Sequence, residues 1–206
     1  MAGFDHHPNT MYASVDMPIY IFGTHHGVGV QLLNDAIGLF THKRVALQYA
    51  WQSRMWGGTF SLGAQAGMLS EHFDGSRLDL DDADDPAFTS SSVDGSSVDV
   101  GIGAYYRCHD WYVGVSAMHL NSPQVDLGET NELDISPTYY LSGGYNIRLS
   151  HPFLSIHTSL LGRTDGVDWR ADISGRLMYT HEKRVMYAGL SYSPTRSVTL
   201  PLGGDI

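Results

Sequence analysis

Hydrophobic and polar residues alternate with a period of two along most of the chain, most clearly from Ser97 to Pro123. Successive side chains of a β-strand point to opposite faces, so this period predicts strands. From Val98 to Tyr106 every second residue is apolar or aromatic, and the other face carries mainly glycine and charged residues. A second alternating segment follows a short turn at Cys108–Asp110. The two segments predict an antiparallel hairpin.

The same alternation recurs on both sides of this hairpin. It predicts further strands in these segments: Met11–Met17, His26–Asn34, Val45–Gln52, Phe60–Met68, Thr138–Arg148, Phe153–Gly162, Val167–Tyr179, Val185–Tyr192 and one beginning near Ser197. Short turns are expected at Met55–Gly58, Cys108–Asp110, Ser150–Pro152 and Thr180–Lys183. Long, acidic connections are expected at Glu71–Ser96 and Asn121–Ser136. Short turns at one end and long loops at the other are typical of outer-membrane β-barrels.

The two faces of the predicted strands have the composition expected of a β-sheet in a membrane. Large apolar side chains share one face, glycine and polar residues share the other, and aromatic residues gather near turns. The predicted aromatic girdle consists of Trp51, Trp56, Tyr106, Trp111, Tyr179 and Tyr187. A soluble antiparallel sheet is the alternative for any single hairpin, but it has no reason to separate its loops by length. The sequence therefore predicts an all-β, antiparallel transmembrane β-barrel of the outer-membrane type, with about eleven strands of a larger barrel.

Composition narrows the classes of function. The chain has a net charge of −10, which disfavours a nucleic-acid partner, because phosphates bind to surfaces rich in lysine and arginine. The single cysteine, Cys108, excludes an internal disulfide and a cysteine-based zinc site. No apolar run is long enough for a membrane helix, and Met1–Thr10 has no signal-peptide pattern. Glycine, with 23 residues, suits strands and tight turns.

Charged residues on the polar face are the candidate interior, or lumen, residues. They are Asp99, Arg107, Asp168, Arg170, Asp172 and Arg176. These residues either set the ion selectivity of a pore or form salt bridges that stabilise the barrel interior. We favour the salt-bridge role. A pore lined by such charges would make the protein a passive channel for small solutes.

The acidic segment is a candidate outer loop. Its carboxylates are Asp79, Asp81, Asp82, Asp84 and Asp85. Their spacing lacks the glycine and terminal glutamate of an EF-hand, so a solvated loop is favoured over a calcium site. His6–His7 and His25–His26 are pairs of adjacent histidines. Adjacent side chains of a strand point to opposite faces, so neither pair is well placed to bind one metal ion. We find no catalytic, cofactor or metal constellation.

Several motifs extend beyond periodicity. The chain carries NDAIGLF at Asn34–Phe40, MWGG at Met55–Gly58, HLNSP at His119–Pro123 and YYLSGGYNIRL from Tyr139. In this order and spacing they resemble the PorP/SprF family, outer-membrane proteins of the type IX secretion system of Bacteroidetes. The resemblance covers nearly the whole chain, from Gly3 to Ile206.

The resemblance implies a non-enzymatic protein of the outer membrane. It implies contact with outer-membrane lipid, with secreted cargo such as gliding adhesins, and with periplasmic components of the secretion ring. Under this resemblance the acidic loop at Asp79–Asp85 is the candidate cargo-contacting loop. Family members begin with a signal peptide and first strands, and they continue past this match. We therefore expect residues 1–206 to form a single β-barrel domain that lacks those segments and the closing strands. Supporting secretion or surface anchoring of cargo is the expected function.

Overall fold

The structure is a computed structural model, and it describes residues 9–74, 92–127, 131–182, 184–194 and 197–205. Every regular element in these residues is a β-strand. None of the described residues forms a helix that is long and apolar enough to span a membrane. The prediction of an all-β antiparallel fold is confirmed, because every pair of strands with a described register is antiparallel.

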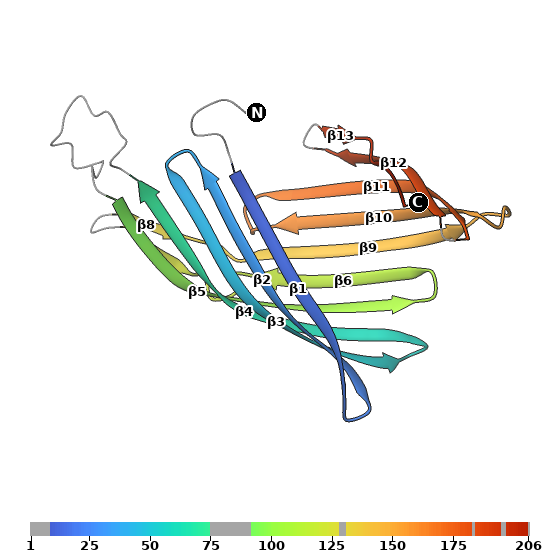
Figure 1. Cartoon of the computed structure of the whole chain (residues 1–206), viewed down its shortest axis with the longest axis horizontal. Coiled ribbons are helices and arrows are strands. Elements are labelled where there is room, and N and C mark those ends of the chain that lie inside the picture. The colour runs from blue at the N-terminus through green and yellow to red at the C-terminus, as the bar shows by residue number, and fades with distance from the viewer. Residues whose placement is uncertain (1–8, 75–91, 128–130, 183, 195–196, 206) are drawn as a thin grey trace. The chain divides into compact units, whose positions relative to one another are not determined.

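Twelve strands of the described part form one sheet in the order β1-β2-β3-β4-β5-β6-β9-β10-β11-β12-β13, with β14 also paired to β12 (Figure 1). Strands β7 and β8 form a separate hairpin. The strands are β1 Asn9–Ile21, β2 Thr24–Ile37, β3 Phe40–Met55, β4 Gly58–Asp74, β5 Ser92–Cys108, β6 Trp111–Met118, β7 Gln124–Leu127, β8 Asn131–Asp134, β9 Thr138–Arg148, β10 Leu154–Thr164, β11 Trp169–His181, β12 Arg184–Ser193, β13 Ser197–Thr199 and β14 Leu202–Asp205.

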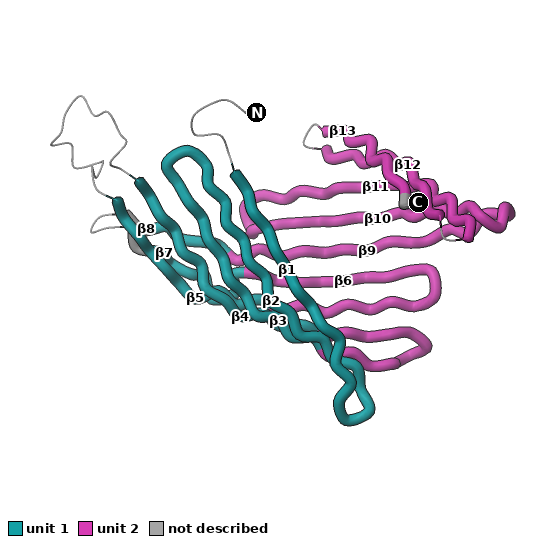
Figure 2. Tube along the Cα trace, in the orientation of Figure 1, with its two compact units in different colours: residues 1–50, 63–101, 119–136 teal, residues 51–62, 102–118, 137–206 magenta. Residues whose placement is uncertain are grey.

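The chain divides into two compact units, coloured separately in Figure 2. Unit 1 comprises residues 1–50, 63–101 and 119–136, and unit 2 comprises residues 51–62, 102–118 and 137–206. We describe each unit by itself. The predicted single domain, without its terminal segments, stays a prediction.

Strands of unit 1 are longer than the alternation predicts. β4 and β5 each have 17 residues, so strand replaces the two ends of the connection expected at Glu71–Ser96. These ends are polar, and cross-strand contacts hold them. His72 Nδ1 and Asp94 Oδ1 lie 2.7 Å apart, and the Asp74 amide donates to the Leu39 carbonyl. Polar extensions of this kind carry little hydrophobic signal, so the sequence pattern misses them.

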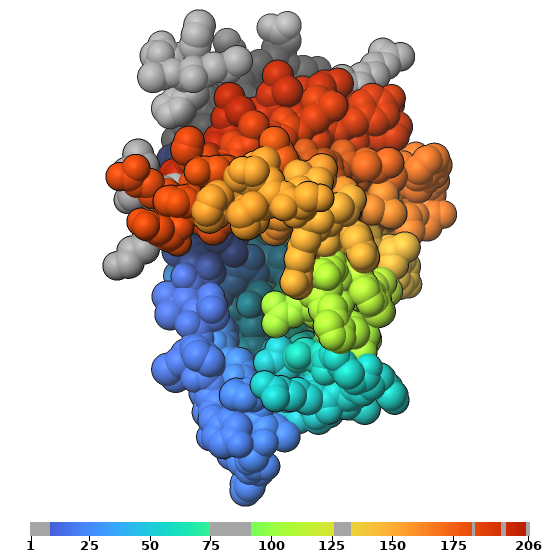
Figure 3. Space-filling model, turned by 90° about the vertical axis from the view of Figure 1, so that its right-hand side faces the viewer, coloured from blue at the N-terminus to red at the C-terminus, as the bar shows by residue number. Residues whose placement is uncertain are grey.

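Unit 2 follows the predicted pattern more closely. β9, at Thr138–Arg148, has the predicted bounds, and β10 and β11 begin within two residues of the predicted positions. The tight turns after β3, β5 and β9 face the viewer in Figure 3, in cyan, yellow-green and light orange. These turns therefore share one end of unit 2, as the sequence predicts.

Candidate functional site

One face of unit 2 carries exposed apolar side chains in rows that cross the strands. In one row Val113 of β6 lies opposite Gly143 of β9, which lies opposite Leu160 of β10. The row continues to Ile173 of β11 and Tyr192 of β12. The four large side chains of this row are 39–55% exposed. We call this surface the apolar face of unit 2.

The opposite face of the same strands is small and polar. Tyr112 of β6 lies opposite Gly144 of β9, and Ser159 of β10 lies opposite Ser174 of β11, with the two Ser Oγ atoms 2.6 Å apart. Ser174 in turn lies opposite Ser191 of β12. These residues are less exposed than their apolar neighbours along each strand. We call this surface the small-residue face of unit 2.

This arrangement is the reverse of a water-soluble sheet, in which large apolar side chains face a core. Among the described residues, the buried apolar side chains are Ala46, Leu69, Pro123 and Val125, and all of them belong to unit 1. Removing a large apolar side chain from water is worth about 1.5–3 kcal/mol. The four side chains of this row are about half exposed, so covering them would gain about 3–6 kcal/mol, against the ~5–15 kcal/mol that stabilises a whole domain. The apolar face therefore favours a non-aqueous surrounding.

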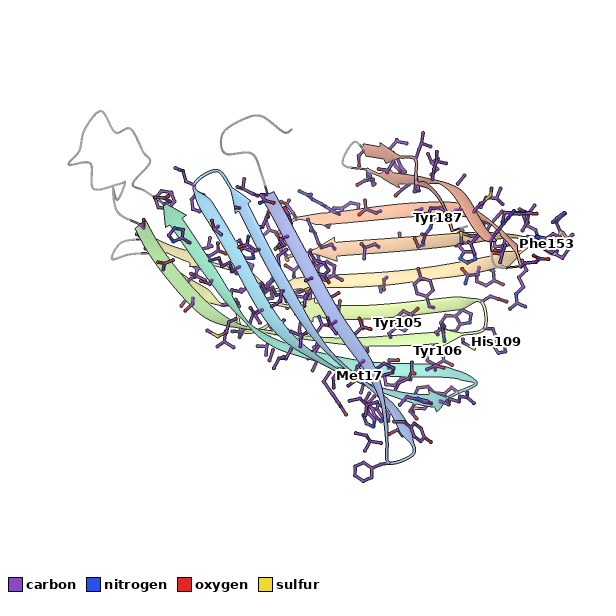
Figure 4. The ribbon with its side chains drawn as sticks, in the orientation of Figure 1. Met17, Tyr105, Tyr106, His109, Phe153 and Tyr187 are labelled. Carbon is purple, nitrogen blue, oxygen red and sulfur yellow. The ribbon has the colours of Figure 1, made fainter. Side chains whose placement is uncertain are left out.

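Aromatic residues cluster at the turn end of unit 2. Tyr106 packs against Trp111 with ring centroids 5.4 Å apart and against Trp56 at 6.4 Å. Tyr179 packs against Phe153 at the β9–β10 turn, with ring centroids 6.2 Å apart. Figure 4 shows Tyr106 near the end of β5, with His109 at the tip of the hairpin.

The tight approach of β4 to β5 requires a glycine beside this cluster. A Cβ atom added at Gly58 would lie 2.7 Å from Tyr106 Oη and 2.5 Å from the Arg107 carbonyl oxygen. With hydrogen alone at this position, Tyr106 Oη can donate to the Trp56 carbonyl at 2.9 Å. Cys108 Sγ donates to the Gly57 carbonyl at 3.6 Å. This contact joins the β5–β6 turn to the β3–β4 turn.

The six residues predicted as a girdle do not share one face. Alternation along the strands places Trp51, Tyr106, Trp111 and Tyr179 on the side of the apolar residues. Trp56 lies in the β3–β4 turn and is 77% exposed. Tyr187 lies on the small-residue face, opposite Gly203 of β14. Their role as a membrane girdle stays a prediction.

Unit 1 contains a cluster of buried charges. Asp99 of β5 is 1% exposed, and its two carboxylate oxygens have different partners. Asp99 Oδ2 lies 2.9 Å from Arg44 Nη2 of β3, and Asp99 Oδ1 lies 2.8 Å from His119 Nδ1. The Arg44–Asp99 contact is close but poorly aligned for a hydrogen bond, so it is chiefly an ion pair. His42 contacts Glu71 in a second pair of the same unit.

The His119–Pro123 segment attaches to β5 after β6 ends. The Asn121 side chain bridges the β5 backbone, because Oδ1 accepts from the Val100 amide at 3.1 Å and Nδ2 donates to the Val98 carbonyl at 2.6 Å. The Leu120 amide donates to the Val100 carbonyl at 3.0 Å. The Asn121 side chain therefore satisfies two backbone groups of β5 that a neighbouring strand would otherwise bond.

The segment then turns into unit 1. His119 and Ser122 have φ values of 57° and 45°, which reverse the chain within a few residues. Pro123, just before β7, and Val125 of β7 are buried, and the Ile135 amide donates to the Pro123 carbonyl. The long connection expected at Asn121–Ser136 therefore contains two short strands, β7 and β8, and its buried residues pack into unit 1.

The candidate lumen charges lie in two different environments. Asp99 is paired and buried, as expected for a packing role. Arg107, Arg170 and Arg176 are exposed on the small-residue face, and Asp172 lies on the same face opposite Leu161. Asp168 precedes β11 and belongs to the β10–β11 turn. The acidic segment Asp79–Asp85 lies outside the described residues.

Sequence reasoning missed several of the residues that define these surfaces. Arg44 and His119 come from segments far from Asp99, and only the fold brings the three together. Arg163 lies opposite Arg170 across β10 and β11, which no local pattern predicts. A signal was present for His119 alone, within the HLNSP motif. Within the described ranges, no three His, Cys, Asp or Glu side chains are grouped to hold a metal ion.

Comparison with known proteins identifies the family. The whole chain, residues 1–206, matches the family described as "Type IX secretion system membrane protein PorP/SprF". No curated protein matches. A similar solved structure is the crystal structure of the beta domain of the Bordetella autotransporter Brka, with 11% sequence identity, a TM-score of 0.45, and coverage of 96% of this chain and 87% of that chain. The match over its full length establishes that this chain belongs to the PorP/SprF family of type IX secretion system membrane proteins.

Proposed function

We propose that this protein is a β-barrel component of the outer membrane that supports the secretion or surface anchoring of type IX cargo. The observation that carries the proposal is the apolar face of unit 2, which lies on the opposite side of the strands from the small-residue face. In this proposal the apolar face contacts lipid, and the small-residue face lies inside the barrel. Family membership supplies the secretion system.

Strand length supports the membrane part of the proposal. β9 and β10 have 11 residues each, which is the length that a tilted strand needs to cross the hydrocarbon core of a bilayer. Aromatic side chains such as Tyr106 and Trp111 gather at one end of these strands, where a bilayer interface would lie. The role proposed is that of an anchor or docking partner, with no catalytic step.

Deletion of the gene in the producing bacterium tests the function. We expect one or more surface proteins to accumulate in the periplasm or to be released into the medium, as measured by mass spectrometry of each fraction. Restoring the gene should return them to the surface. An unchanged surface and medium proteome would contradict the role in secretion, even if the protein is found in the outer membrane.

The acidic segment Asp79–Asp85 is proposed as the cargo contact, from its composition and its place in a long connection. A protein from which this segment is deleted should still insert into the outer membrane and show heat-modifiable migration in gels. Cargo retention at the surface should fall. Normal retention with normal insertion would remove this segment from the proposal.

A passive channel for small solutes is the second candidate function. Charges on the small-residue face favour it, including the exposed Arg170 and the half-buried Asp172. Purified protein in planar bilayers would then conduct ions, and Arg170→Glu would shift the selectivity toward cations. A bilayer that stays silent at high protein concentration would contradict a channel.

A further inference from the structure

The small-residue face of unit 2 carries two arginines directly opposite each other. Arg163 of β10 pairs in register with Arg170 of β11, and both side chains are exposed. Like charges at directly opposed positions destabilise an antiparallel pair. Among the described residues, no carboxylate forms an ion pair with either arginine. This rung therefore places two arginines beside each other, neither of them in an ion pair with a carboxylate of the described residues.

A second basic rung lies further along the same two strands. Arg176 of β11 is opposite His157 of β10. The Arg176 side chain extends across β12, because a Cβ atom added at Gly189 would lie 2.6 Å from Arg176 Cγ. Arg170 and Arg176 share one face and are separated by about 20 Å at ~3.3 Å per residue. We call the surface from Arg163 to Arg176 the arginine strip.

Two nearby carboxylates, Asp172 and Asp165, form no ion pair with these arginines. Asp172 lies on the same face of β11 between Arg170 and Arg176, opposite Leu161, so it contributes one negative charge to the strip. Asp165 Oδ1 accepts from the amides of Val167 and Asp168, at 3.1 and 2.8 Å, within the β10–β11 turn. In contrast, Arg148 of the same unit makes two hydrogen bonds to Asp110, at 2.7 and 3.0 Å. The chain has 22 acidic and 12 basic residues, so acidic partners are plentiful. Unpaired arginines on one face are therefore a specific feature of these strands.

The surface between the two rungs is suited to an extended polypeptide. Ser159, Ser174 and Ser191 lie side by side across β10, β11 and β12, and they are small and carry hydroxyl groups. Guanidinium groups bind carboxylates in a bidentate geometry that a point charge cannot reproduce. An extended chain of about six residues spans the distance from one rung to the other.

We propose that the arginine strip binds an acidic segment of another polypeptide, whose carboxylates pair with Arg163, Arg170 and Arg176. This inference rests on the proposed function in one respect, since it takes the acidic segment to belong to a secreted protein. Lipid headgroups are a poorer fit, because the strip lies on the opposite side of the sheet from the apolar face. A polypeptide with several carboxylates engages both rungs together.

Binding of a labelled peptide to the purified full chain in detergent tests the proposal. The probe is a short fluorescein-labelled peptide of alternating glutamate and serine, followed by fluorescence anisotropy. We expect saturable binding that weakens with added salt, and about a tenfold loss of affinity for each arginine removed by Arg163→Gln or Arg170→Gln. Arg184→Gln is the matched control, because Arg184 is exposed at the start of β12 and lies outside the strip.

A second variant keeps every charge and changes only position. A Cβ atom at position 189 would lie 2.6 Å from Arg176 Cγ and 2.7 Å from the Gly175 carbonyl oxygen. Gly189→Ala should therefore displace the Arg176 side chain together with the adjoining β11 backbone and weaken peptide binding, while heat-modifiable migration shows that the barrel still folds. Equal binding by the wild type and the Arg163→Gln/Arg170→Gln double variant would overturn the proposal. So would equal binding of a glutamine–serine peptide, full competition by inorganic phosphate at matched charge concentration, or binding to anionic vesicles in place of the peptide.

The outcome separates this inference from the function on which it rests. If the peptide fails to bind but gene deletion still mislocalises cargo, the arginine strip is not the binding site and the proposed function stands. If gene deletion leaves all cargo in place, the proposed function fails whatever the peptide does.

Discussion

The charged residues of unit 1 and unit 2 are arranged in opposite ways. In unit 1, Asp99 is buried between Arg44 and His119, so the chain itself neutralises the charge. In unit 2, Arg163 and Arg170 are exposed beside each other, and neither forms an ion pair with a carboxylate of the described residues. One arrangement holds a segment of the chain in place, and the other leaves positive charge available to a ligand.

The difference shows why a charged residue on a polar strand face has no fixed meaning. A buried ion in a low dielectric is costly unless it is paired, so the Asp99 cluster has to be complete for unit 1 to fold. An exposed arginine remains hydrated, so the fold tolerates it without a partner. The degree of burial therefore distinguishes charged residues that stabilise the fold from those that are free to bind a ligand.

The largest expected effect comes from removing the central carboxylate of unit 1. Asp99→Ala leaves Arg44 buried without its counter-ion, and the free energy of unfolding should fall by about 3–5 kcal/mol. Urea titration of the refolded protein in detergent, followed by tryptophan fluorescence, measures the change. Asp172→Ala in unit 2 is the control, with an expected change within about 0.5 kcal/mol. Equal losses for the two variants would remove the distinction between the units.

A smaller effect is expected from the side chain that ties the β7–β8 hairpin to β5. Asn121→Ala deletes hydrogen bonds to the Val100 amide and the Val98 carbonyl, at about 1 kcal/mol for each bond. Hydrogen exchange should accelerate at Val100, and protease cleavage should increase between β7 and β8.

Gln124→Ala serves as the control for this variant. Its hydrogen bond to Asp134 joins exposed residues of the same hairpin, so protection at Val100 should not change. If the control variant is cleaved as fast as Asn121→Ala, the bridge to β5 is not what holds the hairpin.

Removing one arginine of the opposed pair should leave stability unchanged or raise it. Arg163→Gln relieves repulsion with Arg170, so the free energy of unfolding should rise by about 0.2–1 kcal/mol. The same urea titration measures it, with Arg184→Gln as the neutral reference. A loss above this range would mean that Arg163 stabilises the fold, and the two units would then use their charges in the same way.

The smallest effect concerns the β10–β11 turn. Hydrogen bonds from the backbone amides of Asp168 and Val167, with a minor contribution from Arg163, lower the pKa of the Asp165 carboxyl below its ordinary value of 3.8. A lowered pKa means that Asp165 stabilises the turn above its unfolded-state pKa, and that this contribution disappears as the pH falls through the folded pKa.

Amide chemical shifts of Val167 and Asp168, recorded from neutral pH downward, check this dependence. They should move in one acidic transition in the wild type and show no such transition in Asp165→Asn. A transition that persists in the variant would assign the effect to another group.

The sequence was informative where alternation is regular and apolar. The pattern over Thr138–Arg148 has the observed bounds of β9, and the faces of β5 and β6 follow directly from a period of two. It failed where polar residues continue a strand, as at His72 and Asp94, since side-chain pairing there replaces the hydrophobic signal.

The sites were less predictable than the fold, because they depend on contacts between distant segments. Asp99 could be identified as a charge on a polar face, but its burial follows from Arg44 and His119, which no periodicity links to it. Arg170 was likewise identified, but its importance comes from Arg163, which the register of β10 and β11 places beside it.

The central claim is that the two faces of unit 2 lie in different surroundings, one in lipid and the other in water. Single cysteines introduced along β11 at Ala171, Asp172, Ile173 and Ser174, in a Cys108→Ser background, can be labelled with a fluorophore after reconstitution into vesicles. The account predicts that brominated lipid quenches labels at 171 and 173, and that aqueous iodide quenches labels at 172 and 174. Quenching by iodide at all four positions, without alternation, would contradict it.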